Sequence, residues 1–208
     1  MTTIPGMSRR LRLCGASPLL LLLLFLTPAA AEDDPIVVVE QFQASLLAVM
    51  REASTLGVKG RYERMLPPIE RAFDLGAMTR IAIGEHWTRA DESQRTRLVR
   101  AFGRMSASTV AILFDGYSGE RFKTLGERAG QNETRYVNTI IVLSDGDVSL
   151  TYVAKRIGNG WKLIDVIVDD GISELTVRKS EYRRVLASDG VEGLIAALES
   201  KAGELIAQ

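Results

Sequence analysis

Few side chains in this sequence of 208 residues have the type and spacing that catalysis or metal binding requires. The one histidine, His86, stands beside Trp87, and the one cysteine, Cys14, precedes a run of leucines. A general base needs an orienting partner and a nucleophile within reach, and zinc sites draw mainly on Cys and His ligands. We therefore expect no metal, no cofactor and no catalytic residue, and we expect His86 to be a packing or surface residue.

Carboxylates supply two further candidates. Asp145 and Asp147 flank Gly146, but a calcium loop of the EF-hand type needs more oxygen ligands and a distal Glu, so we expect a turn there. Asp165 lies within an apolar run, where an unpaired charge is costly. We expect it to form a structural ion pair, for example with Arg178. The alternative is proton transfer by Asp165 in an isomerase or hydrolase built on a cone-shaped α+β scaffold.

A basic cluster is formed by Arg178, Lys179, Arg183 and Arg184. Such a cluster is usually a solvated helix face. The alternative is contact with an anionic head group or an acidic partner, because clustered charges of one sign attract the opposite sign. Both interpretations stay open at the level of sequence.

The N-terminal segment predicts a cleaved signal peptide over residues 1–31. Three arginines precede an apolar stretch from Leu19 to Leu26, which is too short to span a membrane, and Ala29–Ala31 fits a cleavage site. An uncleaved anchor is the alternative. Cleavage would remove three of the 26 basic residues and none of the 26 acidic ones, which leaves a formal net charge of −3. That balance argues against a nucleic-acid partner, and residues 32–208 are expected to form a single domain.

Apolar residues at three- and four-residue spacing predict helices in the first half of the chain. Asp34 and Pro35 mark the start of the first helix, and Gly57 can end it. A second helical pattern from Tyr62 to Phe73 contains Pro67–Pro68, which must kink or divide a helix.

Two further helices have clear start signals. Asp74 can cap a short helix that Gly84 closes. Asp91–Gln94 resembles a capping box, and it opens a long helix that reaches Phe114.

The period of the pattern then changes from that of a helix to that of a strand. Alternating apolar residues and turn signals at Asp145–Gly146 and Gly158–Gly160 predict four strands, over residues 121–125, 134–143, 148–157 and 161–168. Ser173 can cap a helix that runs to about Leu186, and a last helix begins near Asp189.

This order predicts an α+β fold. It consists of N-terminal helices, a twisted antiparallel four-stranded meander and two C-terminal helices. Because a twisted sheet curls, helices laid across its concave side either fill the space with side chains or leave an apolar pocket between sheet and helices.

Several motifs follow one another in a recognisable order: Phe73-Asp74, Gly84-x-x-Trp87, the capped helix from Gln94 to Phe114, Gly160-Trp161-Lys162, Asp165-Val166 and Gly171-Ile172-Ser173. Together they resemble the toluene-tolerance family, which includes the MlaC-type periplasmic phospholipid carriers. Three more segments look most like the hopanoid-biosynthesis-associated branch of that family, HpnM: Gly60-Arg61-Tyr62, Phe114–Glu120 and Ile172–Leu175.

The resemblance implies a soluble periplasmic carrier, not an enzyme, that takes the tails of a phospholipid or a hopanoid into an apolar pocket. It also implies transfer of the lipid between an inner-membrane ABC transporter complex and an outer-membrane lipoprotein complex. The lipid would be cargo rather than a cofactor, and we expect a monomer.

We expect the pocket wall to combine one face of the sheet with apolar stripes of the helices. The predicted lipid-binding residues are Ile140, Val142, Leu150, Tyr152, Val166 and Val168 from the strands and Leu46, Phe73, Met78, Phe102, Val110 and Phe114 from the helices. An error of one residue in a strand would turn its other face inward. The alternative is that these side chains fill a core, which would leave an interaction module without a pocket.

Overall fold

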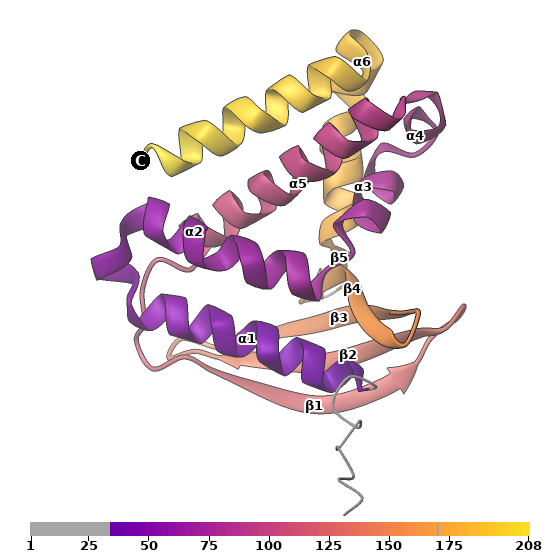
Figure 1. The fold of residues 1–208 in the computed structure, drawn as a ribbon. Coiled ribbons are helices and arrows are strands. Elements are labelled where there is room, and N and C mark those ends of the chain that lie inside the picture. Colours follow the sequence, from indigo (N-terminus) through magenta and orange to yellow (C-terminus); the bar gives the residue numbers. More distant parts are fainter. Residues whose placement is uncertain (1–33, 170) are drawn as a thin grey trace, which may run out of the picture.

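Helices cover one face of a five-stranded antiparallel sheet in the computed structural model, which describes residues 34–169 and 171–208 (Figure 1). The predicted signal peptide lies outside the described residues. The described helices are α1 (Pro35–Arg51), α2 (Ala53–Ala72), α3 (Leu75–Ile83), α4 (His86–Arg89), α5 (Glu92–Leu113) and α6 (Glu174–Ile206). The described strands are β1 (Arg121–Ala129), β2 (Thr134–Val142), β3 (Val148–Ile157), β4 (Gly160–Val168) and β5 (Ile172–Ser173), and they pair in chain order. The predicted α+β class is confirmed.

Three aspartates begin helices, as predicted from the sequence. Asp34 and Asp74 each accept a hydrogen bond of 2.8 Å from a backbone N–H in the first turn of α1 and α3. At α5, Asp91 and Gln94 form both halves of the capping box. These bonds satisfy N–H groups that the first turn of a helix leaves without a partner.

The break in the second helical region falls at Gly57, whereas the sequence predicted a kink or a division at the two prolines, and the helix is not divided there. Gly57 has φ 60° and ψ −179°, a conformation that is essentially confined to glycine. The helix then continues through Pro67 and Pro68. The carbonyl groups that lose their N–H partner belong to Glu63 and Arg64, which are exposed and can be hydrated.

The sheet has one more strand than the predicted four. β5 contains only Ile172 and Ser173, which pair with the end of β4. Two residues are too few to show the period of a strand, so the sequence pattern could not reveal it. The first strand is also longer than predicted, because β1 continues past a bulge at Leu125 to Ala129.

The C-terminal region is one helical element with a break instead of the two separate helices predicted. Gly190, with φ 65° and ψ −158°, is the residue inside α6 that departs from helical geometry. Figure 1 shows α6 changing direction part of the way along its length. Ser173 caps its start by accepting a 3.0 Å hydrogen bond from the N–H of Thr176, which confirms the predicted cap.

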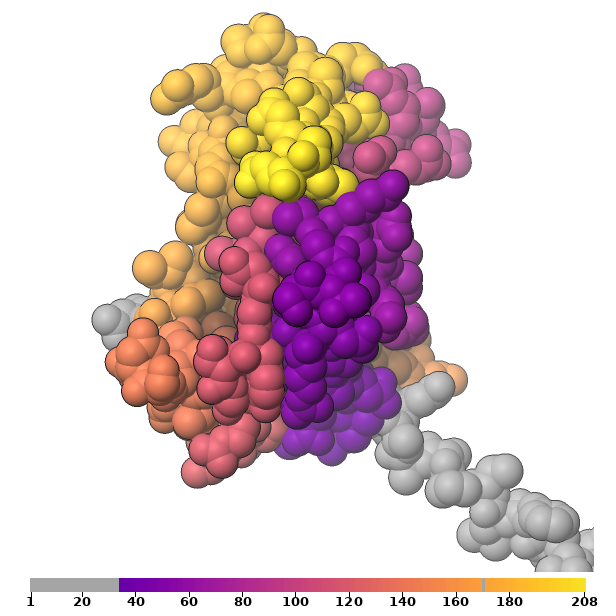
Figure 2. All heavy atoms as spheres, turned by 90° about the vertical axis from the view of Figure 1, so that its left-hand side faces the viewer, coloured from indigo at the N-terminus to yellow at the C-terminus, as the bar shows by residue number. Residues whose placement is uncertain are grey.

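The helices lie in layers above the sheet. α1 packs on the strands, α2 packs between α1 and α5, and α6 runs along α5 (Figure 1). Figure 2 shows α1 and α2, in indigo and purple, side by side with the rose segment between α5 and β1, with the yellow end of α6 above them. The sheet and the helices therefore meet around one interior region, where the buried apolar side chains gather.

Candidate functional site

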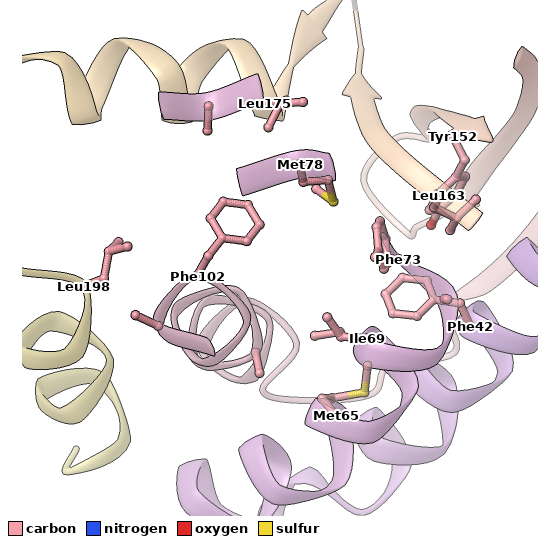
Figure 3. Packing of buried hydrophobic residues seen from close by; sticks show 14 of the residues in the cluster. Phe42, Met65, Ile69, Phe73, Met78, Phe102, Tyr152, Leu163, Leu175 and Leu198 are labelled. Atoms are coloured by element: carbon pink, nitrogen blue, oxygen red, sulfur yellow. The ribbon is translucent and has the colours of Figure 1, made fainter. Parts of the chain in front are cut away.

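A central cavity of about 420 Å³ lies where the sheet meets α1, α2, α3, α5 and α6. Figure 3 shows Ile69, Phe73, Met78 and Phe102 arranged around this open space, whereas Met65 packs in the core outside it. Cavities of roughly 300–1,000 Å³ with mainly apolar walls are typical of sites that bind small molecules. The lining consists of Phe42, Leu46, Ile69, Phe73, Leu75, Met78, Phe102, Ser106, Thr109, Val110, Leu113, Phe114, Ile141, Val148, Leu150, Tyr152, Val166, Val168, Glu174, Leu175 and Arg178.

The central cavity has a buried end and a half-buried end, which we call the mouth. At the buried end Phe42 and Ile69 are almost inaccessible to solvent. At the mouth Val148 and Arg178 are half-buried, and Leu113 is 68% exposed. The mouth therefore lies between the end of α5 and the start of α6.

Ten of the twelve residues predicted from the sequence line the central cavity. They come from both halves of the chain: Leu46, Phe73, Met78, Phe102, Val110 and Phe114 from the helices and segments next to them, and Leu150, Tyr152, Val166 and Val168 from β3 and β4. The fold thus brings together side chains that are far apart in the sequence.

Ile140 and Val142 do not line the central cavity, and their predicted position is wrong. Thr139 of β2 lies opposite Leu150, while Ile140 lies opposite Ser149, which is exposed. Directly opposite residues share one face of a sheet, so Ile140 and Val142 belong to the outer face. Ile141 is the residue of β2 that reaches the cavity.

A bulge in β4 keeps the inner face of that strand apolar along its length. The pairing with β3 shifts between Leu163 and Asp165, which leaves Ile164 as the extra residue. The bulge reverses the alternation of inward-facing and outward-facing side chains along β4. Leu163 therefore packs in the buried core while Val166 still faces the central cavity.

Most of the lining residues that sequence reasoning missed are neighbours of residues that it found. Phe42 precedes Leu46 by one helical turn, and Ile141 lies in β2 between Ile140 and Val142, which were predicted. The apolar pattern around these positions in the sequence could have identified them. Two of the missed residues, Glu174 and Arg178, are charged, and nothing in the sequence pattern places them at an apolar cavity.

The polar groups beside the buried end have partners. Gln43 donates a hydrogen bond of 3.1 Å to the hydroxyl of Thr139 and one of 3.5 Å to that of Tyr152. Burial raises the pKa of Tyr152 to about 12, although the hydrogen bond from Gln43 lowers it in part. Tyr152 therefore keeps its proton at neutral pH and presents an uncharged ring to the cavity.

Arg61 holds the end of α5, which carries the mouth residues Val110 and Leu113. Its buried guanidinium donates a 2.7 Å hydrogen bond to the carbonyl oxygen of Ala111 and a 3.1 Å bond to that of Ala53. The last carbonyl groups of a helix have no partner within the helix, so Arg61 satisfies one that would otherwise be unpaired.

Asp165 joins the end of β4 to the start of α6. Its carboxylate accepts hydrogen bonds from the N–H groups of Val166 and Leu175 at 2.8 and 3.1 Å, and from the hydroxyl of Ser173 at 2.6 Å. The predicted pairing with Arg178 is wrong, because Arg178 pairs with glutamates instead. Asp165 is not among the lining residues, so the alternative of an isomerase or hydrolase loses the acid on which it depended.

The rest of the described chain offers little for covalent chemistry. Residues 34–169 and 171–208 contain no group of three or more His, Cys, Asp or Glu side chains that could hold a metal ion. Over the same residues, no helix is both long and apolar enough to cross a membrane. His86 begins the short helix α4 and does not line the central cavity.

A larger hollow of about 560 Å³ lies on the other side of Phe73 and Leu75, but it is more open and has a mixed charge. Glu70, Arg100 and Lys162 are among its lining residues. Water can fill an open groove with charged walls at little cost, so we regard the smaller apolar cavity as the candidate site.

Comparisons with known proteins identify the family and the fold. The sequence profile of the family described as MlaC protein matches residues 40–200. No curated protein matches the chain. Among solved structures, the phospholipid-binding protein from Ralstonia solanacearum in complex with a phospholipid is similar, with a TM-score of 0.73 and 20% sequence identity. The match covers 83% of this chain and 98% of that chain, which shows that the two share a fold.

Proposed function

Because the chain belongs to the MlaC protein family, we propose that it is a periplasmic lipid carrier and not an enzyme. In this proposal the central cavity holds the hydrophobic tails of one lipid, and the polar part of the lipid stays at the mouth between α5 and α6. The protein acts as a monomer that carries lipid between an inner-membrane ABC transporter complex and an outer-membrane lipoprotein complex.

The observation that carries the proposal is the apolar wall of the central cavity. Tyr152 contributes a neutral ring, and the two charged side chains of the lining, Glu174 and Arg178, lie toward the mouth. The structural relative from Ralstonia solanacearum, which was solved in complex with a phospholipid, supports the same class of ligand.

The energetics of burial fit a carrier that needs partners. Burying one methylene group contributes roughly 0.8 kcal/mol, so a tail of about sixteen carbons contributes on the order of 12 kcal/mol before the costs of binding. A ligand held this strongly leaves slowly without assistance. Transfer therefore requires a membrane complex that opens the cavity or competes for the tails.

The cargo is a phospholipid or a hopanoid. The resemblance of Gly60-Arg61-Tyr62 and Phe114–Glu120 to the HpnM branch favours a hopanoid, while the ligand of the solved relative favours a phospholipid. Lipid extraction from the purified protein distinguishes the two.

A pair of adjacent substitutions in β3 tests the role of the cavity. Val148→Trp places a large ring in the wall near the mouth, whereas Ser149→Trp places the same ring on the exposed outer face. We expect Val148→Trp to lower lipid uptake from phospholipid vesicles several-fold, because its indole occupies the space of the tails. Ser149→Trp should retain the uptake of the wild-type protein.

The two variants separate a cavity effect from a general loss of structure. Circular dichroism and the unfolding midpoint verify that both are folded. If both variants take up as much lipid as the wild-type protein, the central cavity is not the lipid site.

A further inference from the structure

Two charged side chains, Glu174 and Arg178, stand in an otherwise uncharged lining. Both belong to the first turns of α6, at the mouth of the central cavity. The other members of the basic cluster, Lys179, Arg183 and Arg184, are exposed and do not line the cavity. Of the four residues in this cluster, Arg178 alone lines the cavity. It lies where the polar part of a cargo molecule would lie.

Arg178 has hydrogen-bonding capacity to spare. Its Nη1 lies 3.0 Å from a carboxylate oxygen of Glu181 and donates a hydrogen bond to it. Its Nη2 lies 3.9 Å from a carboxylate oxygen of Glu174, which is an ion pair without a hydrogen bond. A guanidinium carries five N–H donors, so most of them have no acceptor within the described residues.

The position of Arg178 makes this spare capacity significant. Its side chain is only 20% exposed, so solvent screens its charge less than at an open surface. Glu181 holds one edge of the guanidinium in place, which reduces the ordering that binding requires. The backbone N–H groups of Leu175 and Thr176 already donate to Asp165 and Ser173, so the start of α6 itself offers fewer donors than Arg178 does.

We propose that Arg178 binds the phosphate of a phospholipid head group whose tails fill the central cavity, and that Glu174 competes with the phosphate for it. This inference rests on the proposed carrier function. The planar guanidinium can donate two parallel hydrogen bonds to phosphate oxygens, which gives both attraction and orientation. Glu174 loses its loose contact when the lipid enters, while Glu181 keeps its hydrogen bond.

The test is a competition between two lipids that share their acyl chains. Purified protein is incubated with vesicles that contain phosphatidylcholine and diacylglycerol, and native mass spectrometry measures the ratio of the two bound lipids. A hydrogen bond to a charged group contributes enough that Arg178→Gln should lower the ratio of phospholipid to diacylglycerol by roughly 10- to 100-fold. Glu174→Gln should raise that ratio, since it removes the competing carboxylate. Lys179→Gln, with the same change of charge at the next residue, should leave the ratio unchanged.

The outcomes separate this inference from the proposed function. If Arg178→Gln keeps the wild-type ratio while both lipids bind, Arg178 does not recognise the phosphate, and if Glu174→Gln keeps it, Glu174 does not compete for Arg178. In either case the protein is still a carrier. If the wild-type protein takes up neither lipid, it does not carry phospholipids and this inference fails. The carrier function fails as well if vesicles that contain a hopanoid also give no uptake. If glycerol phosphate, which lacks tails, binds as tightly as the phospholipid, the site serves free phosphate esters and the lipid assignment is overturned. Should Arg178→Gln not fold, the Glu174→Gln result decides.

Discussion

Individual polar side chains in the interior hold the wall of the central cavity in position. Asp165 ties β4 to α6, Arg61 ties α2 to the end of α5, and Gln43 ties α1 to the hydroxyls of Thr139 and Tyr152. The apolar surroundings of Asp165 in the sequence predicted that it needs a partner. They did not reveal which partner, because the groups it binds are brought to it by the junction between β4 and α6.

Tyr152 gives a prediction about pH. Burial raises the pKa of Tyr152 from 10.0 to about 12, and burial raises that of Tyr182 to about 12 as well. Below pH 10 both the folded and the unfolded chain keep these protons, so the contribution to stability is complete there. Between about pH 10 and 12 the unfolded chain loses them first, and stability falls by on the order of 2 kcal/mol for each tyrosine.

Urea unfolding at about pH 8, 10 and 11 measures this dependence. Tyr152→Phe should lose a smaller amount of stability over that range than the wild-type protein, and Tyr182→Phe should behave in the same way. An identical alkaline loss in all three proteins would show that these hydroxyls do not control it.

Arg61 gives a prediction about stability. Arg61→Met should lower the free energy of unfolding by about 1–3 kcal/mol, because it leaves the buried carbonyl of Ala111 without its charged donor. Arg64→Met, on an exposed part of the same helix, should change it by less than about 1 kcal/mol even though it breaks the ion pair with Glu52. Equal effects in chemical denaturation would contradict the role assigned to Arg61.

At the scale of the elements, local signals in the sequence predicted the starts and types of the helices and strands well. Asp34, Asp74, Asp91 and Ser173 act through hydrogen bonds within a few residues, so the sequence contains all the information that is needed. The inward face of β2 was not predictable in this way. The run Ile140–Val142 is apolar at every position, so only the pairing with β3 decides which side chain faces inward.

Gly190 tests whether the break in α6 depends on backbone conformation. Its φ of 65° and ψ of −158° are strained for any other residue, although no atom would lie within 4 Å of an added Cβ. Gly190→Ala should therefore destabilise the protein by about 1–3 kcal/mol. Gly203→Ala, also in α6 and also with open space around it, should stabilise it by up to about 1 kcal/mol.

The two alanine substitutions add the same methyl group to the same helix, so opposite signs in the change of unfolding free energy isolate the effect of φ. If Gly190→Ala is neutral or stabilising, α6 can run straight, and its break is not fixed by this glycine.

At the scale of the whole molecule, the layers of helix and sheet produce a cavity that no sequence motif announces. An apolar stripe such as the one with Phe102 and Val110 looks the same whether it fills a core or lines a space. The cavity arises where the sheet meets α1, α2, α3, α5 and α6, and this arrangement depends on the complete fold. The family resemblance predicted a lipid pocket, and the geometry adds an apolar cavity of about 420 Å³ with an opening and two charged residues toward its mouth.

The claim that this cavity carries lipid is tested most directly by the contents of the purified protein. The protein is exported, purified without detergent and examined by native mass spectrometry, with extraction and identification of any bound lipid. The account predicts one phospholipid or hopanoid bound to each chain. When that lipid dissociates, the measured mass of the protein should fall by the mass of the lipid. A protein that is consistently empty, and that also fails to take up lipid from vesicles, would contradict it.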